Sequence, residues 1–350
     1  MRETAEDSAG KGRRGGKPGA GRAVTMAAVG RIAGVSQVTV SRALSDPSKV
    51  SPETLHRIRE AIEITGFVPN ALAGALASAR SHLISALVPS ITNIVYASMI
   101  QSFTEQMRAQ GYQILMSETG FELAEEEALV AAHLSRRPDA LLLTGIHHSP
   151  QTRKMLLAAR IPVVEVWDIT ESPIDICVGF NHVESGRAAA DFLVEAGYSR
   201  FASVSAGDER ALRRKDAFAA EIRRRTGNAV AEVNCGGPAS LAHGREALRR
   251  LIGEQGFDGG AVFCSSDLLA QGVMIEAGLR GLVIPDRLAV MGFGDQDYAA
   301  HLVPALTTMH VDRAALGASA ARAILARLDG QKDVPAIHDL GFEIMRRRSA

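Results

Sequence analysis

From residue 83 onward, short apolar runs alternate with longer amphipathic stretches. The apolar runs lie at residues 83–88, 113–116, 140–144, 162–166, 201–205, 261–264 and 288–292. Stretches between them, such as 125–135, 184–195 and 242–252, carry apolar residues at helical spacing. This alternation predicts parallel sheets covered by helices on both faces. About eleven candidate strands exceed the number that one sheet usually contains. We therefore expect an α/β body of two doubly wound parallel-sheet subdomains.

Residues 25–77 differ, because short helical runs are separated there by glycine or proline and none resembles a strand. Helices are predicted over 26–33, 37–44 and from Pro52 to Gly66, capped by Thr25, Ser36 and Ser51. The expected inner-face residues are Met26, Val29, Ile32 and Ala33 of the first helix and Leu55, Ile58 and Ile62 of the third. Two short helices joined at Gly34 and braced by a third predict a helix-turn-helix head.

In a helix-turn-helix the second helix enters the DNA major groove with its N-terminal residues at the base edges. Gln37, Val38 and Arg42 are its exposed side chains of suitable size, since glutamine can bond adenine, valine can contact a thymine methyl and arginine can bond guanine. The short hydroxyls suited to phosphates are those of Ser36, Thr39 and Ser41. The alternative is an accessory three-helix bundle with Arg42 on a solvated face.

The charge distribution favours DNA binding although the chain as a whole has 39 basic and 39 acidic residues. Residues 1–80 hold 12 Lys and Arg against 7 Asp and Glu, whereas residues 81–350 hold 27 against 32. A basic head therefore precedes a mildly acidic body. Residues 1–23 are rich in glycine and basic residues and are interpreted as a flexible basic tail.

Several classes of protein are disfavoured. Cys177, Cys235 and Cys264 form no CxxC pair, so we expect neither a zinc site nor a disulfide framework, and a reducing cytoplasm is the default compartment. We expect no membrane span and no signal peptide, because the chain lacks an apolar run of 18 residues and its N-terminus lacks a hydrophobic stretch. No nucleophile elbow, P-loop or HExxH motif predicts an enzyme, and we expect no cofactor. The pair His147 and His148 is interpreted as surface residues of a loop rather than metal ligands.

Three motifs, in order along the chain, resemble the lactose-repressor family of bacterial regulators. They are IAGVSQVTVSRAL at 32–44, VSPET at 50–54 and GFVPNALA at 66–73, and the similarity continues to Phe342. Within that family, residues 162–165, 178–180, 208–210 and 339–342 resemble the gluconate-utilisation repressors. The resemblance implies a periplasmic-binding-protein-like body.

The resemblance also implies a DNA-binding hinge at 69–80. Paired hinge helices of a dimer would enter the minor groove, with Leu76 as the wedge and Asn70 and Ala73 close to the DNA. The alternative is a plain alanine-rich linker with Leu76 packed on the body.

A small-molecule effector is expected in the cleft between the subdomains, near the carboxyl ends of strands. By the resemblance, Arg214 is the pocket arginine, whereas Arg210, Arg213 and Lys215 are expected in solvent. The other candidates are Ser90, Tyr96, Trp167 and Asp267; Trp167 can instead pack in the core, and Asp267 can instead cap a helix. Gly294 stands where several relatives carry an acidic ligand contact, which favours an effector with its own negative charge.

Together these observations predict a helix-turn-helix domain at 24–68 and an effector-binding and dimerisation domain at 81–350. We expect a homodimeric repressor of sugar-acid catabolism that binds a pseudo-palindromic operator and is released by an effector such as gluconate. The alternative is a soluble sugar-binding protein without direct gene regulation.

Overall fold

The computed structural model describes residues 24–68, 80–120, 122–331 and 333–350. These residues belong to two compact units, a head and a body, divided between Ser81 and His82.

The head consists of the three predicted helices. They are α1 (Met26–Ala33), α2 (Gln37–Ser45) and α3 (Pro52–Thr65), with a short 3₁₀ turn η1 (Pro47–Lys49) between the last two. The three predicted caps are confirmed, since the side chains of Thr25, Ser36 and Ser51 each accept a backbone N–H three residues ahead. Gly34 ends α1 with φ at 66°, a left-handed conformation that glycine adopts without strain.

The core of the head is small and corrects one predicted position. Its buried apolar residues are Val29, Ala33, Val40, Ala43, Ile58, Ala61 and Phe67. Ile32, predicted on the inner face, is 53% exposed. The inner stripe of α1 instead runs through Met26, Val29, Gly30 and Ala33, at the i, i+3, i+4, i+7 spacing of one helix face, and Ile32 falls outside it.

The described residues of the body form two six-stranded sheets, which confirms the predicted division into two sheet subdomains. The sheet of the N-terminal subdomain has the order β11-β5-β4-β3-β1-β2 and is parallel throughout. Its strands are β1 (Leu83–Val88), β2 (Gln113–Glu118), β3 (Ala140–Thr144), β4 (Val163–Val166), β5 (Ile176–Gly179) and β11 (Ile337–Asp339). The sheet of the C-terminal subdomain has the order β12-β10-β9-β8-β6-β7, and only β12 is antiparallel to its neighbour. Its strands are β6 (Phe201–Ser205), β7 (Val230–Asn234), β8 (Gly260–Cys264), β9 (Leu288–Phe293), β10 (Thr307–His310) and β12 (Glu343–Met345).

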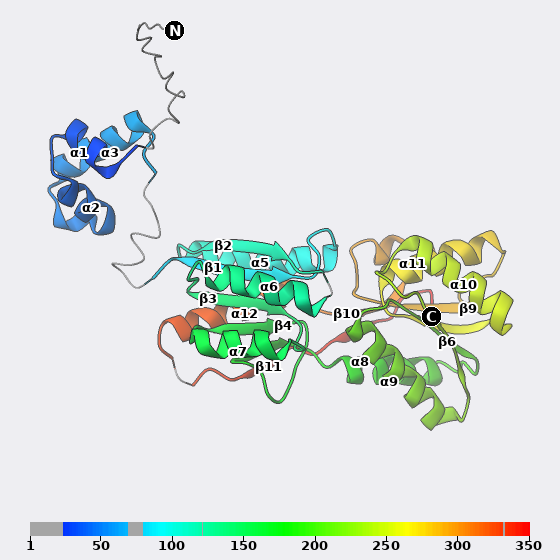
Figure 1. Cartoon of the computed structure of the whole chain (residues 1–350). Helices are drawn as coiled ribbons and strands as arrows, with labels where there is room; N and C mark the ends of the chain where they lie inside the picture. Colours follow the sequence, from blue (N-terminus) through cyan, green and yellow to red (C-terminus); the bar gives the residue numbers. More distant parts are fainter. Residues whose placement is uncertain (1–23, 69–79, 121, 332) are drawn as a thin grey trace, which may run out of the picture. The chain divides into compact units, whose positions relative to one another are not determined.

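Helices pack in pairs on these sheets (Figure 1). In the N-terminal subdomain the pairs are α5 (Ile94–Ala109) with α12 (Arg313–Leu328) and α6 (Leu123–Leu134) with α7 (Pro150–Ala159). In the C-terminal subdomain they are α8 (His182–Glu195) with α9 (Glu209–Thr226) and α10 (Leu241–Gln255) with α11 (Asp267–Leu279); a 3₁₀ turn η2 (Ala299–His301) precedes β10. The chain crosses between the subdomains after β5, β10 and β11, so three connections join them. Within the described ranges, no helix has both the length and the apolar character that a membrane span requires.

Glycine allows the closest helix contacts. A Cβ added to Gly317 of α12 would lie 2.1 Å from the carbonyl oxygen of Met99 in α5. A Cβ on Gly186 of α8 would lie 2.3 Å from the carbonyl oxygen of Arg214 in α9. Both distances are far shorter than van der Waals contact, so these positions require glycine for packing.

Substituting Gly317→Ala should therefore destabilise the protein by about 1–3 kcal/mol, because the helices must move apart. The matched control is Gly253→Ala in α10, where an added Cβ would meet nothing within 4 Å. That change should stabilise by roughly 0.5–1 kcal/mol through helix propensity. Urea unfolding of both variants measures the difference, and equal stabilities would contradict the packing argument.

Candidate DNA-binding face and effector cleft

Helix α2 presents a continuous exposed face at its N-terminus. Gln37, Val38, Ser41 and Arg42 are exposed, whereas Val40 and Ala43 on the opposite side are buried in the head core. Val38 is 66% exposed. Side chains of this size and chemistry on one short helix suit the edges of bases in a major groove.

The predicted phosphate-contacting hydroxyls are partly engaged within the helix. The Ser36 hydroxyl accepts the backbone N–H of Thr39 at 3.1 Å and lies 2.9 Å from the Thr39 hydroxyl. Ser36 therefore fixes the start of α2, and the phosphate roles of Ser36, Thr39 and Ser41 stay predictions. The predicted hinge contacts Asn70, Ala73 and Leu76 lie outside the described residues.

A cavity of about 340 Å³ opens in the body between the two subdomains. It lies at the carboxyl ends of parallel strands, because its walls follow β1, β2, β3, β4 and β6. Its lining residues are Pro89, Thr119, Gly120, Glu122, Leu123, Glu126, Thr144, Gly145, Ile146, His147, Asp168, Gly207, Asp208, Glu209 and Arg210. Open α/β sheets bind ligands at this edge.

Arg210 provides a cationic group on the cavity wall. Its Nη2 donates to the Tyr96 hydroxyl at 2.7 Å, across from α9 to α5. Its Nη1 is buried and has no hydrogen-bond partner among the described residues. A buried guanidinium N–H without a partner is costly, and a guanidinium on the cavity wall suits an anionic ligand.

The expectation that Arg210, Arg213 and Lys215 are solvated is wrong. Each of the three side chains is bonded to another element of the body. Arg213 donates to the Asp168 carboxylate at 2.5 Å, and Lys215 donates to Glu232 at 2.6 Å. The Arg210–Tyr96 and Arg213–Asp168 contacts therefore link the two subdomains.

Arg214 is buried and engaged within the body. Its Nη1 donates to His182 Nδ1 at 2.8 Å, its Nη2 donates to the Ser265 carbonyl at 2.9 Å, and the guanidinium lies 3.9 Å from the centre of the Phe293 ring. Burial, followed by the charge of Arg214, lowers the pKa of His182 well below its usual value, so the imidazole is neutral. Its Nε2–H then donates to the Trp167 carbonyl at 2.8 Å. Arg214 is not among the cavity-lining residues, and its role as an effector contact stays a prediction.

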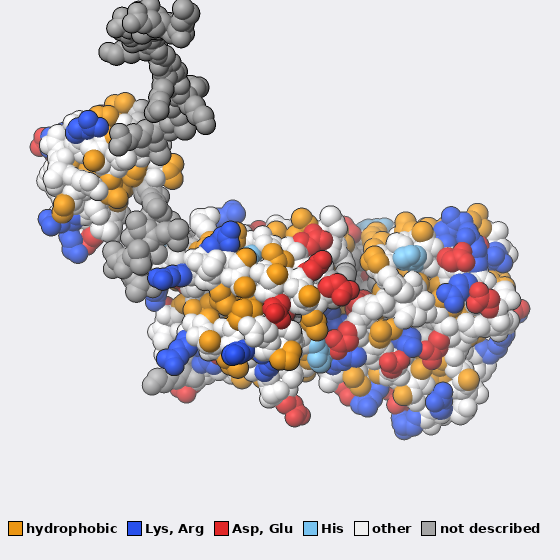
Figure 2. All heavy atoms as spheres, in the orientation of Figure 1, with side chains coloured by type: hydrophobic (Ala, Val, Ile, Leu, Met, Phe, Trp, Pro, Cys, Tyr) orange, Lys and Arg blue, Asp and Glu red, His pale blue; other side chains and the backbone are white. Residues whose placement is uncertain are grey.

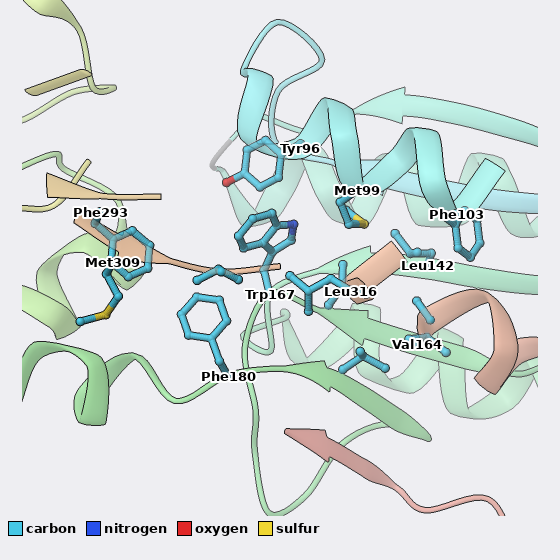
Figure 3. Close-up of a cluster of buried hydrophobic side chains, with 14 of the residues drawn as sticks. Tyr96, Met99, Phe103, Leu142, Val164, Trp167, Phe180, Phe293, Met309 and Leu316 are labelled. Carbon is cyan, nitrogen blue, oxygen red and sulfur yellow. The ribbon is translucent and has the colours of Figure 1, made fainter. Parts of the chain in front are cut away.

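Aromatic side chains connect the subdomains, because Phe180 contacts Phe293 of β9 at a centroid distance of 5.9 Å, and Trp167 stands between Tyr96 and Phe180 (Figure 3). Trp167 is 4% exposed and makes edge contacts with both rings, at centroid distances of 5.7 and 6.2 Å. Of the two alternatives for Trp167, the structure therefore favours packing. Tyr96 and Ser90 line a separate cavity of about 250 Å³.

Asp267 is buried at the start of α11, where Ser266 and not Asp267 caps the helix by accepting the Leu269 N–H. The capping alternative for Asp267 is therefore wrong. The Asp267 carboxylate accepts from the Thr308 hydroxyl at 2.5 Å and from the Gln296 backbone at 2.6 Å. Burial raises its pKa to about 6. Its predicted contact with an effector hydroxyl stays a prediction.

His148, expected on the surface, is fully buried between two carboxylates. Its Nδ1 lies 2.8 Å from Glu126 Oε1, and its Nε2 lies 3.3 Å from Glu165 Oε1. Burial alone would disfavour the imidazolium, but the hydrogen bonds and charges of Glu126 and Glu165 raise the pKa of His148 to about 9. The loop after β3 folds inward here because α6 and β4 supply these two partners.

The His148 imidazolium should make the body lose stability as the pH rises. The pKa of His148 is about 9 in the folded protein and 6.5 for a free histidine, so the stabilisation is fully present below pH 6.5 and is lost as the pH rises through 9. The shift corresponds to at most about 3 kcal/mol. Urea unfolding of the wild type and of His148→Gln between about pH 6 and 10 measures it. The variant should lose less stability over this range, and parallel profiles would contradict the assignment.

Comparison with known proteins identifies both units. Residues 25–70 match the model described as "Bacterial regulatory proteins, lacI family", and residues 190–350 match the model described as "Periplasmic binding protein-like domain". The HTH-type transcriptional regulator GntR of Pseudomonas aeruginosa is 36% identical over 93% of this chain and 95% of its own length. A LacI-family transcriptional regulator from Silicibacter pomeroyi is 31% identical with a TM-score of 0.87, covering 93% of this chain and 99% of its own. The lac repressor dimer bound to operator shares the fold at 22% identity and a TM-score of 0.82, over 94% of this chain and 99% of its own.

Proposed function

This chain belongs to the lacI family of bacterial regulatory proteins and is a DNA-binding transcriptional regulator, and we propose that it represses sugar-acid catabolism in response to a gluconate-type effector. The proposed domains are a basic tail at 1–23, a DNA-binding head at 24–68, a hinge at 69–80 and an effector-binding and dimerisation body at 81–350. A regulator that binds bacterial DNA acts in the cytoplasm, which is the proposed compartment.

The unpartnered Nη1 of Arg210 is the observation that carries the effector proposal. It supplies a buried cationic donor in a cavity whose lining also contains hydroxyl and carboxylate groups, including Thr119, Thr144 and Asp208, beside apolar residues such as Leu123 and Ile146. A carboxylate at one end of a ligand pairs with guanidinium, and a chain of hydroxyls suits the remaining acceptors. A linear polyhydroxy acid has both features.

The absence of an acidic side chain at Gly294 also supports an anionic effector. Its φ is 123°, in the region that favours glycine, and its carbonyl accepts from Arg313 Nη1 at 2.6 Å. By the resemblance to the family, several relatives carry an acidic ligand contact at this position, and its replacement by glycine here supports an effector with its own negative charge.

The proposed DNA complex contains a homodimer. The lac repressor, which shares this fold, is a dimer on its operator. Two copies of α2 related by a two-fold axis read a pseudo-palindromic site, with Gln37, Val38 and Arg42 at the bases and with Asn70, Ala73 and Leu76 of the hinge in the minor groove.

Effector binding is proposed to change how the two subdomains sit on each other and thereby to separate the hinges. The contacts that bridge the subdomains, Arg210–Tyr96 and Arg213–Asp168, lie at the cavity that the effector would occupy. By thermodynamic linkage, effector and operator must weaken each other by the same factor.

Calorimetric titration of the full-length protein with gluconate tests the effector. The control is sorbitol, which has the same carbon chain with hydroxyls throughout and no carboxylate. Gluconate should bind and sorbitol should bind at least about tenfold more weakly, a difference of about 1.4 kcal/mol. Equal affinities would contradict the role given to the carboxylate.

A further inference from the structure

The cavity wall is acidic on the side of the N-terminal subdomain and along the first turn of α9. Five carboxylates line it, and Figure 2 shows acidic side chains gathered where the two lobes of the body meet. They are Glu122 and Glu126 at the start of α6, Asp168 after β4, and Asp208 and Glu209 at the start of α9. A ligand anion therefore meets one unpartnered cationic donor, Arg210, and several groups of its own sign.

Most of these carboxylates already have a hydrogen-bond or ion-pair partner within the protein. Asp168 accepts from Arg213 at 2.5 Å, and Asp208 caps α9 through the Ala211 N–H at 3.0 Å. Glu209 pairs with His147 at 2.9 Å, where both side chains are more than half exposed. Glu126 differs from these, because one of its oxygens is held by a fully buried partner while the residue still lines the cavity.

Glu126 is held rigidly by the body. Its Oε1 lies 2.8 Å from Nδ1 of His148, and only 11% of the Glu126 side chain is exposed. On its other side His148 faces Glu165, whose second oxygen accepts the Ile174 N–H at 2.6 Å. The imidazole of His148 lies between the two carboxylates and does not line the cavity.

We propose that Glu126 restricts the effector to sugar acids with a single carboxylate, an inference that rests on the proposed sugar-acid effector. The carboxylate of the effector binds Arg210 on the C-terminal subdomain, and Glu126 accepts a hydrogen bond from an effector hydroxyl on the N-terminal subdomain. Glu126 is thus a specificity-determining residue.

The selectivity follows from which groups can donate hydrogen bonds and from the repulsion between like charges. A carboxylate only accepts hydrogen bonds, so it pairs with a hydroxyl donor but has nothing to exchange with a second ionised carboxylate. Two like charges close together in a partly buried site repel each other, and that cost excludes the wrong ligand. His148 donates no hydrogen bond to a second effector carboxylate, because its two ring nitrogens lie against the two glutamates.

The experiment compares gluconate, a monocarboxylate, with glucarate, which has a second carboxylate at the other end of the chain. Calorimetry on the full-length wild type should give at least about tenfold tighter binding of gluconate. Glu126→Gln keeps the shape and adds an amide donor, so it should reduce the gluconate preference about tenfold, mainly by improving glucarate binding. Glu126→Asp keeps the charge and should retain the preference.

Glu127→Gln is the matched control, since Glu127 lies on the same helix but bonds the Ser149 hydroxyl at 2.6 Å and does not line the cavity. It should leave the preference unchanged. If gluconate binds but Glu126→Gln keeps the wild-type preference, Glu126 does not set selectivity and the effector proposal stands. If neither sugar acid binds the wild type, the effector proposal fails and this inference fails with it.

Discussion

Replacing Arg210 with glutamine should weaken gluconate binding at least about a hundredfold. Truncating one partner of a buried, hydrogen-bonded charge pair costs about 2–5 kcal/mol, because the other charge loses its partner. Arg210 is the group that we assign to the effector carboxylate, since its Nη1 is buried without a partner among the described residues. In an operator-release assay, the variant should therefore need far more gluconate to dissociate from DNA.

The matched control is Arg187→Gln. Arg187 also lies on a helix of the C-terminal subdomain, but it pairs with Glu184 on an exposed surface. This change should alter neither gluconate affinity nor operator release. An Arg210→Gln variant that binds gluconate like the wild type would show that Arg210 does not contact the effector carboxylate.

Replacing Arg42 with alanine should cost about 1–3 kcal/mol on the operator and relax selectivity at one base pair in each half-site. Arg42 is exposed on α2, the helix whose N-terminal half carries the other predicted base contacts. A guanidinium bonded to guanine loses both hydrogen bonds when truncated, and only operators with that guanine are affected.

Fluorescence anisotropy with a set of duplexes, each altered at one position, measures this effect. The wild type should discriminate strongly at the affected base pair, whereas Arg42→Ala should bind all four bases there with similar affinity. A uniform loss across every duplex would instead make Arg42 a phosphate contact.

Features fixed by local sequence could be predicted. The caps at Thr25, Ser36 and Ser51 depend on side chains within three residues of the helices that they start, and all three are confirmed. The strands over 83–88, 140–144 and 201–205 were predicted with the observed bounds, because buried parallel strands are short and continuously apolar. The two-subdomain architecture could be predicted because about eleven candidate strands exceed the number that one sheet usually contains.

The cleft could not be predicted residue by residue, because its contacts join distant parts of the chain. Tyr96 and Arg210 are 114 positions apart, and Asp168 and Arg213 are 45 apart. Only the folded sheets bring these pairs together, so Arg210 and Arg213 were expected in solvent. His148 was misplaced for the same reason, since both Glu126 and Glu165 come from other elements.

Ile32 shows a different limit. The periodic pattern predicts burial even for an apolar residue at the edge of a helical stripe. Which residues of α1 are buried depends on how the helix packs against the rest of the head. The inner stripe passes through Gly30, which has no side chain and therefore gives no hydrophobic signal.

The central claim is that this regulator binds a specific palindromic site and is released by a sugar acid. The most direct measurement is selection of bound duplexes from a random pool, carried out in parallel with and without gluconate. A palindrome should be enriched only in the gluconate-free selection. Enrichment in both selections would contradict gluconate as the effector, and enrichment only with gluconate would contradict release by it. A pool without any enriched palindrome would contradict the central claim itself.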